Sequence, residues 1–125
     1  QDRKDEAEAC LREAIRLDPR HPNAWHRLAL LFEMQERFAD AEPIAREAVR
    51  LDPESADAQN LLGVVLAGLD RHEDAAAYYR AAIGLKKDFT IALSNLGNTL
   101  RMIGELDEAE QSLREAFRLQ PNSPE

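Results

Sequence analysis

The sequence is poor in cysteine and in basic residues, and it contains no long apolar run. Its single cysteine, Cys10, excludes an internal disulfide and a cysteine-cluster metal site. No apolar segment approaches the roughly 20 residues of a membrane-spanning helix. Lys and Arg total 16 against 24 Asp and Glu, which gives a net charge of -8. Because phosphate backbones and anionic lipid surfaces are bound by basic faces, neither nucleic acid nor a membrane surface is expected as a partner.

Motifs of catalysis and of cofactor binding are also missing. The three histidines, His21, His26 and His72, lack the spacing of four residues that places a zinc-binding pair on one face of a helix. The five glycines form no phosphate-binding loop. Cys10 has no candidate base near it in the sequence, and we expect it to be buried and inert. The sequence therefore predicts a protein that is not an enzyme and uses no cofactor or metal.

What the sequence does contain is an internal period of 34 residues. Three sets of residues recur at this step: Ala7, Ala41, Ala75 and Ala109; Ala14, Ala48, Ala82 and Ala116; and Leu17, Leu51, Leu85 and Leu119. A fixed repeat of this length indicates one supersecondary unit stacked on copies of itself, each copy burying a face that it could not bury alone.

The period divides the chain into units. Residues 22–55, 56–89 and 90–123 are full units, residues 1–21 match the last part of a preceding one, and residues 124–125 begin another. We expect these units to form a single solenoid domain. Because the chain starts inside a unit and without an initiator Met, we also expect it to be part of a longer array.

Each unit is predicted to hold two helices. In residues 90–123, apolar residues spaced by three and four predict an amphipathic helix that ends near Gly104. A second periodic run begins at Leu106 and ends before Pro121, since proline cannot continue a helix. By the same phase, residues 2–17 are the second helix of a partial unit. Pro43 lies about one turn inside a second helix, where it would either delay the start of the helix, kink it, or be tolerated as a first-turn proline; we expect it to be tolerated.

These patterns resemble those of a known family. The residues at its signature positions are Trp25, Leu28, Ala29, Phe32, Phe38, Ala41, Ala48 and Pro53 in one unit, and Leu96, Gly97, Leu100, Ala109, Ala116 and Pro121 in another. The chain is similar to a tetratricopeptide repeat array of about three and a half repeats. The resemblance implies an all-α, right-handed α-solenoid of antiparallel helix pairs. The middle unit departs from the signature, with Gln59 in place of Trp, His72 in place of an aromatic residue and Lys87 in place of proline.

The resemblance also implies that the first helices of the units line a concave groove. The residues predicted to face it are Asn23, His26, Arg27, Leu30, Met34, Asn60, Leu61, Val64, Ile91, Asn95, Asn98, Arg101 and Met102, in rows that also contain Glu33 and Asp57. Amides can bond a peptide backbone, Met and aliphatic side chains supply apolar area, and Arg can bind a carboxylate. We expect a protein-binding scaffold that holds a peptide or a partner helix in this groove. The alternative is that these are merely solvated positions.

One binding mode of the family is not expected. Chaperone-cofactor members hold a C-terminal carboxylate with Lys, Asn and Arg side chains on three successive first helices. The matching positions here are His26, Leu30, Leu61, Ile91 and Asn95. Because Lys and Arg are missing from them, the carboxylate clamp is absent and a role in binding chaperone tails is not expected.

Two other functions stay open at this point. The array has no polar capping helix at either end, so Leu11, Ile15, Leu113 and Phe117 are expected to be partly exposed and to support self-assembly into a homo-oligomer. Residues 92–110 also look like repeats that precede glycosyltransferase domains, which suggests an accessory domain of a larger transferase. A single cysteine fits the cytoplasm, although export stays open.

Overall fold

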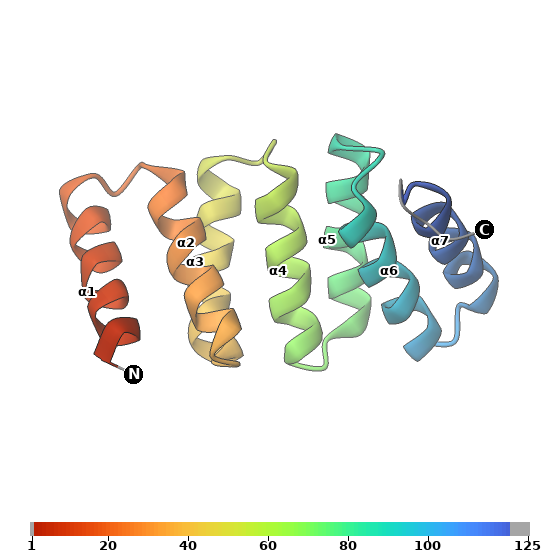
Figure 1. The fold of residues 1–125 in the computed structure, drawn as a ribbon, viewed down its shortest axis with the longest axis horizontal. Coiled ribbons are helices and arrows are strands. Elements are labelled where there is room, and N and C mark those ends of the chain that lie inside the picture. Colours follow the sequence, from red (N-terminus) through yellow and green to blue (C-terminus); the bar gives the residue numbers. More distant parts are fainter. Residues whose placement is uncertain (1, 121–125) are drawn as a thin grey trace.

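The computed structural model describes residues 2–120, and all its regular structure is helical. The helices are α1 (Asp2–Leu17), α2 (Pro22–Met34), α3 (Phe38–Leu51), α4 (Ala56–Gly68), α5 (His72–Leu85), α6 (Thr90–Met102) and α7 (Leu106–Arg118). They follow one another along the length of the array in chain order, with α2 in front of α3 in the view of Figure 1. The prediction of an all-α, right-handed solenoid of antiparallel helix pairs is confirmed.

The helix boundaries follow the sequence period. Each first helix, α2, α4 and α6, begins one repeat length after the last, and so do the second helices α3, α5 and α7. Pro43 is tolerated inside α3, which begins at Phe38 in register with the others and continues through the proline to Leu51, so the alternative of a late start is wrong. Ala41, Ala45 and Ala48 of α3 are buried against its neighbours. This packing outweighs the one backbone hydrogen bond that the proline removes, since tertiary contacts supply most helix stability in proteins.

The turn inside each unit has the same backbone conformation. Glu36, Asp70 and Gly104 occupy one repeat position, and all three have positive φ, of 58°, 63° and 88°. The next residue donates its backbone N–H to a carbonyl five residues back, as in Arg37 to Phe32 (2.8 Å). This closure is a Schellman motif, which glycine adopts without strain and other residues at a cost of about 1–2 kcal/mol. Of these three turns, the sequence predicted only the helix end at Gly104.

The start of the middle unit explains why Gln59 can replace the signature Trp. Trp25 Nε1 donates a hydrogen bond to the carbonyl of Pro19 at 2.8 Å. One repeat later, Gln59 Nε2 donates to the carbonyl of Pro53 at 2.9 Å. The amide therefore makes the same bond to the turn, although it supplies less apolar area.

Small residues let the two helices of a unit approach each other. Ala29, Gly63 and Gly97 share one position of the first helices, and all are buried. A Cβ atom built on Gly63 would lie 2.6 Å from Tyr79 Cε1 of α5, and one on Gly97 would lie 2.5 Å from Leu113 Cγ of α7. These helix pairs thus pack at a distance that leaves no room for a side chain.

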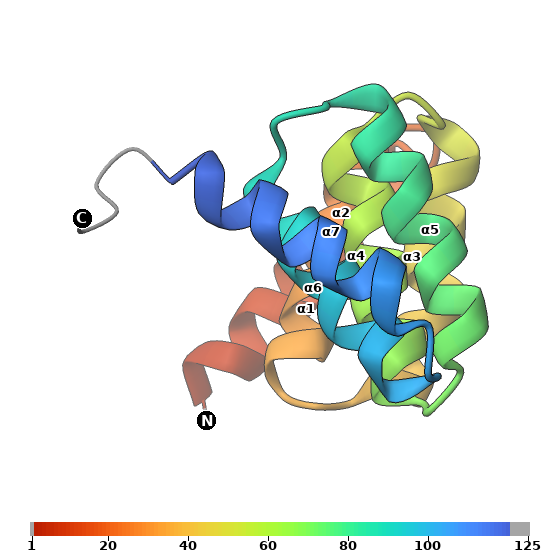
Figure 2. The ribbon, with the colours of Figure 1, turned by 90° about the vertical axis from the view of Figure 1, so that its right-hand side faces the viewer.

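First helices are closer to one another than second helices are. Backbone contacts join α2 to α4 and α4 to α6, whereas within residues 2–120 no such contacts join successive second helices. The side of the first helices is therefore the inner side of the array. Figure 2 views the array from the end at which α7 lies.

Long side chains bridge the wider spacing of the second helices. Arg37, which precedes α3, pairs with Glu8 of α1 (3.4 Å), and Arg71, which precedes α5, pairs with Glu42 of α3 (2.9 Å). At the third junction the charges are reversed, because Arg80 of α5 pairs with Glu108 of α7 at 2.9 Å.

Candidate functional site

The inner side carries a hollow formed by all three first helices. We call it the central hollow; its volume is about 280 Å³, and it is lined by His26, Leu30 and Glu33 of α2, Asp57, Asn60, Leu61 and Val64 of α4, Phe89, and Ile91 and Asn95 of α6. Seven of these ten residues belong to the predicted groove set, and they come from three units of the chain. The phase of the repeat therefore brings side chains far apart in sequence to one place.

A pair of amides crosses the middle of the central hollow. Asn95 Nδ2 of α6 donates a hydrogen bond to Asn60 Oδ1 of α4 at 3.2 Å, and the pair is partly buried. The amide nitrogen of Asn60 and the amide oxygen of Asn95 have no partner in this bond. They are the donor and the acceptor that a peptide backbone requires.

Apolar side chains surround the amide pair. Ile91 is 62% exposed and Leu30 is 39% exposed, which is unusual for large aliphatic residues in an ordered helix. On α4, Leu61 is buried and Val64 is half-buried. The hollow therefore combines a packed apolar floor with accessible apolar edges.

The ionisable groups of the hollow have few partners of opposite charge. Burial lowers the pKa of His26, and the nearby carboxylate of Asp57 opposes that shift only in part. His26 is therefore neutral at pH 7. Burial raises the pKa of Glu33, and the neighbouring Glu36 raises it further. No Lys or Arg lines the central hollow.

The other predicted groove residues lie elsewhere on the inner side. Asn23 and Arg27 line a hollow at the α1–α2 end, and Met34 borders an adjacent one that Arg27 and Leu30 also line. Asn98, Arg101 and Met102 are exposed on α6, where Arg101 Nη2 donates to Asn98 Oδ1 at 3.3 Å. The predicted set thus forms a central site and two outlying groups.

Sequence reasoning gave no role to three residues of the central hollow. Glu33 and Asp57 fall in the predicted rows, and their negative charge beside neutral neighbours could have marked them as candidate site residues. Phe89 precedes α6 and belongs to a turn. The helical phase contains no information on turn residues, so nothing in the sequence indicated that its ring borders the hollow.

The two ends of the array present different surfaces. Leu11 and Ile15 of α1 are half-buried and pack against the core, but Cys10 is exposed, so its predicted burial is wrong. The reason is that, among the described residues, no first helix of the same unit lies beside α1. Ala14 is accordingly exposed, whereas its equivalent Ala48 is buried.

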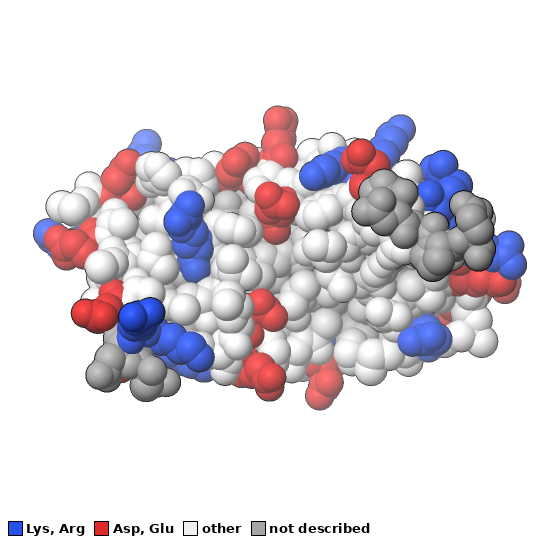
Figure 3. Space-filling view, viewed as in Figure 1, with Lys and Arg blue, Asp and Glu red and all other residues white. Residues whose placement is uncertain are grey.

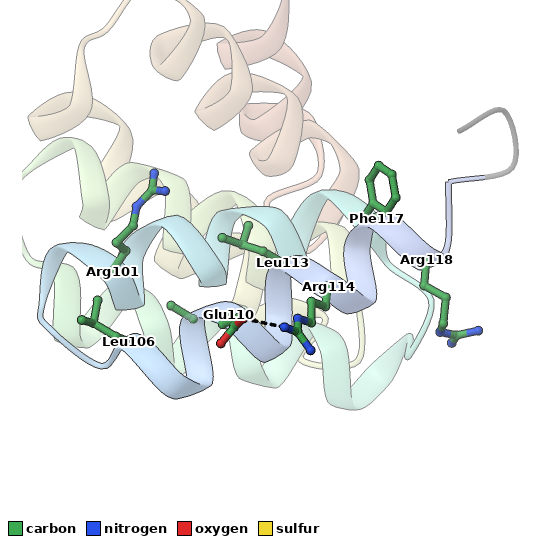
Figure 4. Close-up of a pocket in the computed structure, with 8 residues that line it drawn as sticks. Arg101, Leu106, Glu110, Leu113, Arg114, Phe117 and Arg118 are labelled. Atoms are coloured by element: carbon green, nitrogen blue, oxygen red, sulfur yellow. Dashed lines mark hydrogen bonds and ion pairs between the residues drawn. The ribbon is translucent and has the colours of Figure 1, made fainter. Parts of the chain in front are cut away.

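At the other end, α7 borders a larger hollow of about 710 Å³. Leu106 is 62% exposed and Phe117 is 58% exposed, and Leu113 is half-buried between them. Figure 4 shows these side chains along α7, with Arg101 reaching over from α6 and an ion pair between Arg114 and Glu110.

Comparison with protein families accounts for the repeated units. One sequence profile described as tetratricopeptide repeat matches residues 1–56 and 28–89, and a second with the same description matches residues 90–123. The chain belongs to the tetratricopeptide repeat family. Tetratricopeptide repeats generally mediate protein–protein interactions, and no curated protein matches the chain in sequence.

Solved structures of tetratricopeptide arrays have the same fold. A crystal structure of MamA is 25% identical to the chain, with a TM-score of 0.86 over 93% of the chain and 68% of MamA. MamA residues 41 to the end from Desulfovibrio magneticus RS-1 are 19% identical, with a TM-score of 0.87 over 94% of the chain and 67% of that structure. The chain thus spans about two thirds of these tetratricopeptide structures. Within residues 2–120, no helix is both long and apolar enough to cross a bilayer.

Proposed function

We propose that this tetratricopeptide array is a non-catalytic scaffold that holds an extended peptide or a partner helix in the groove of α2, α4 and α6. The observation that supports it is the central hollow, in which exposed apolar side chains lie beside amides with unused hydrogen-bonding groups. Apolar surface removed from water contributes about 25 cal/mol per Å². A ligand that covers Ile91 and Leu30 therefore gains free energy, while the amides fix its register.

The prediction for this site concerns Ile91. Changing Ile91→Glu places a charge at the exposed apolar edge of the hollow, so we expect a groove-bound peptide to lose at least about tenfold in affinity, or 1.4 kcal/mol. Peptides would be selected from a displayed random library on the parent chain. Fluorescence anisotropy of the labelled peptides would then give the dissociation constants.

The control variant is Ala77→Glu, because Ala77 is an exposed alanine on α5, a second helix. It adds the same charge and should leave the affinity unchanged. Equal affinities of the parent chain and the Ile91→Glu variant would show that the peptides bind outside the groove, and the proposal would then fail.

Self-assembly is a second candidate function, supported by the exposed apolar face of α7. Helices α1 and α7 are both second helices, so stacking the two ends head to tail would leave each without the first helix that covers such a face in the interior. Two α7 faces can instead pack on each other about a twofold axis. The paired surface would bury Leu106, Leu113 and Phe117.

We therefore expect the molar mass from light scattering to rise with protein concentration, and Phe117→Ser to abolish the rise by removing the largest exposed side chain of the face. The Ala77→Glu variant again serves as control, since Ala77 is on α5 and does not line the hollow that α7 borders. A monomer at every concentration of the parent chain would exclude this function.

A further inference from the structure

The ion pairs of the array are distributed unevenly between its two sides. Within residues 2–120, the ion pairs involve second helices and the residues just before them, and none includes a residue of α2, α4 or α6. Many carboxylates on the outer side are thus paired with arginines of the same chain. The two carboxylates of the central hollow, Glu33 and Asp57, are not.

Glu33 is in an electrostatically unfavourable position. It lies in the last turn of α2, where the helix dipole is negative, and it is half-buried. Glu36 is close enough to raise its pKa. A carboxylate that is partly desolvated, close to another acid and at the negative end of a helix is stabilised by any cation that reaches it.

Asp57 adds a second negative charge to the same hollow. It lies in the first turn of α4 and lines the hollow together with His26, whose pKa is lowered by burial. The cationic side chains of the inner side lie outside the central hollow, Arg27 towards α1 and Arg101 towards α7. Figure 3 shows acidic side chains around the middle of this face and most basic ones towards its two ends.

We infer that the central hollow binds a peptide segment in which a lysine or arginine lies next to an apolar residue. The negative charges of Glu33 and Asp57 attract the cationic group into the hollow, and the apolar residue covers Ile91. The Asn60–Asn95 pair bonds the backbone between them. This inference rests on the proposed function and specifies the chemistry of its ligand.

Charge also sets the register of the ligand. A basic side chain placed one helix away from the centre would approach Arg27 or Arg101 and be repelled. A peptide with an acidic residue at its centre would meet two carboxylates that no Lys or Arg of the described chain pairs with. The favoured ligand is therefore basic at the centre and neutral or acidic at its ends.

The test uses three labelled peptides that are identical except at the central position, which is lysine, norleucine or glutamate, with leucines beside it. Norleucine keeps the aliphatic stem of lysine and removes the charge. We expect the lysine peptide to bind at least about fivefold more tightly than the norleucine peptide and at least about twentyfold more tightly than the glutamate peptide. Added salt should narrow both differences, because screening weakens charge pairs.

The decisive variant is Glu33→Gln with Asp57→Asn, which removes both charges and preserves side-chain shape. We expect it to bring the lysine and norleucine peptides to within about twofold of each other while the norleucine peptide keeps its affinity. The matched control, Glu54→Gln with Glu73→Gln, removes two exposed carboxylates outside the hollow and should retain the preference. Circular dichroism melts would verify that all variants are folded.

Equal binding of the lysine and norleucine peptides to the parent chain would overturn the inference, and so would a preference that survives in the Glu33→Gln/Asp57→Asn variant. In either case the proposed function stands if Ile91→Glu still weakens binding. If none of the three peptides binds to the parent chain, and library selection also fails, both the inference and the proposed function are refuted.

Discussion

Replacing Phe32 by alanine is expected to lower the free energy of unfolding by about 3–5 kcal/mol, the range for removing a fully buried phenylalanine. Phe32 is 1% exposed and lies in the core formed by α2, α3 and α4. The guanidinium groups of Arg37 and Arg12 lie 4.4 and 5.7 Å from its ring centre. The substitution therefore removes packing and two cation–π contacts, one of which holds α1. Urea denaturation followed by circular dichroism would measure the loss.

Met34→Ala is the control for this prediction, because Met34 lies on the same helix and is 68% exposed. We expect it to change stability by no more than about 0.5 kcal/mol. A loss below about 1 kcal/mol for Phe32→Ala would contradict the assignment of Phe32 to a close-packed core.

Gly63→Ala is expected to destabilise the array by about 1–3 kcal/mol, although alanine is the better helix former. The added Cβ atom would lie 2.6 Å from Tyr79 Cε1 and 2.7 Å from Tyr79 Cδ1. The ring cannot move aside freely, since Tyr79 is 2% exposed and burial raises the pKa of its hydroxyl to about 12. Relief of the clash requires α4 and α5 to separate.

Gly84→Ala, on the neighbouring helix α5, is expected to stabilise the array instead. A Cβ atom on Gly84 of α5 meets nothing within 4 Å, so the substitution should stabilise the array by about 0.5–1 kcal/mol through helix propensity alone. Thermal melts of the two variants should shift in opposite directions. A Gly63→Ala variant that melts at or above the parent temperature would show that the helices do not approach closely.

The fold could be predicted from the sequence because a repeat sets both the period and the phase of its helices. The 34-residue step gave the order of helices, the units and the side that faces inwards. The sequence left the effect of Pro43 open between a late start, a kink and the favoured tolerated proline, and the packing of α3 against its neighbours decides it. The exposure of Cys10 was open to prediction from the phase, since residues 2–17 are a second helix and, within residues 2–120, no first helix of the same unit lies beside it.

The sequence predicted on which side of the array the candidate residues lie, but not how deeply each side chain is buried. Helical phase correctly places Leu61 and Asn98 on the same side of the array, yet Leu61 is buried and Asn98 is exposed. The difference arises from the size of neighbouring side chains and from the turn residue Phe89, which the periodicity does not describe. The hydrogen bond between Asn60 and Asn95 joins two units and depends on their spacing.

The reversed ion pair at the third junction gives the junctions between units different charge partners. Glu42 pairs with Arg71 between the first two full units, but the residue one repeat after Arg71 is Glu105. Deleting residues 56–89 would preserve the period and bring Glu105 opposite Glu42, so two acids would meet where an ion pair now stands. Each such contact on an exposed surface is worth at most about 1 kcal/mol. Even so, the charges that meet on the outer side depend on the order of the repeats, and the residues that form this pattern are not the ones that pack the core of each repeat.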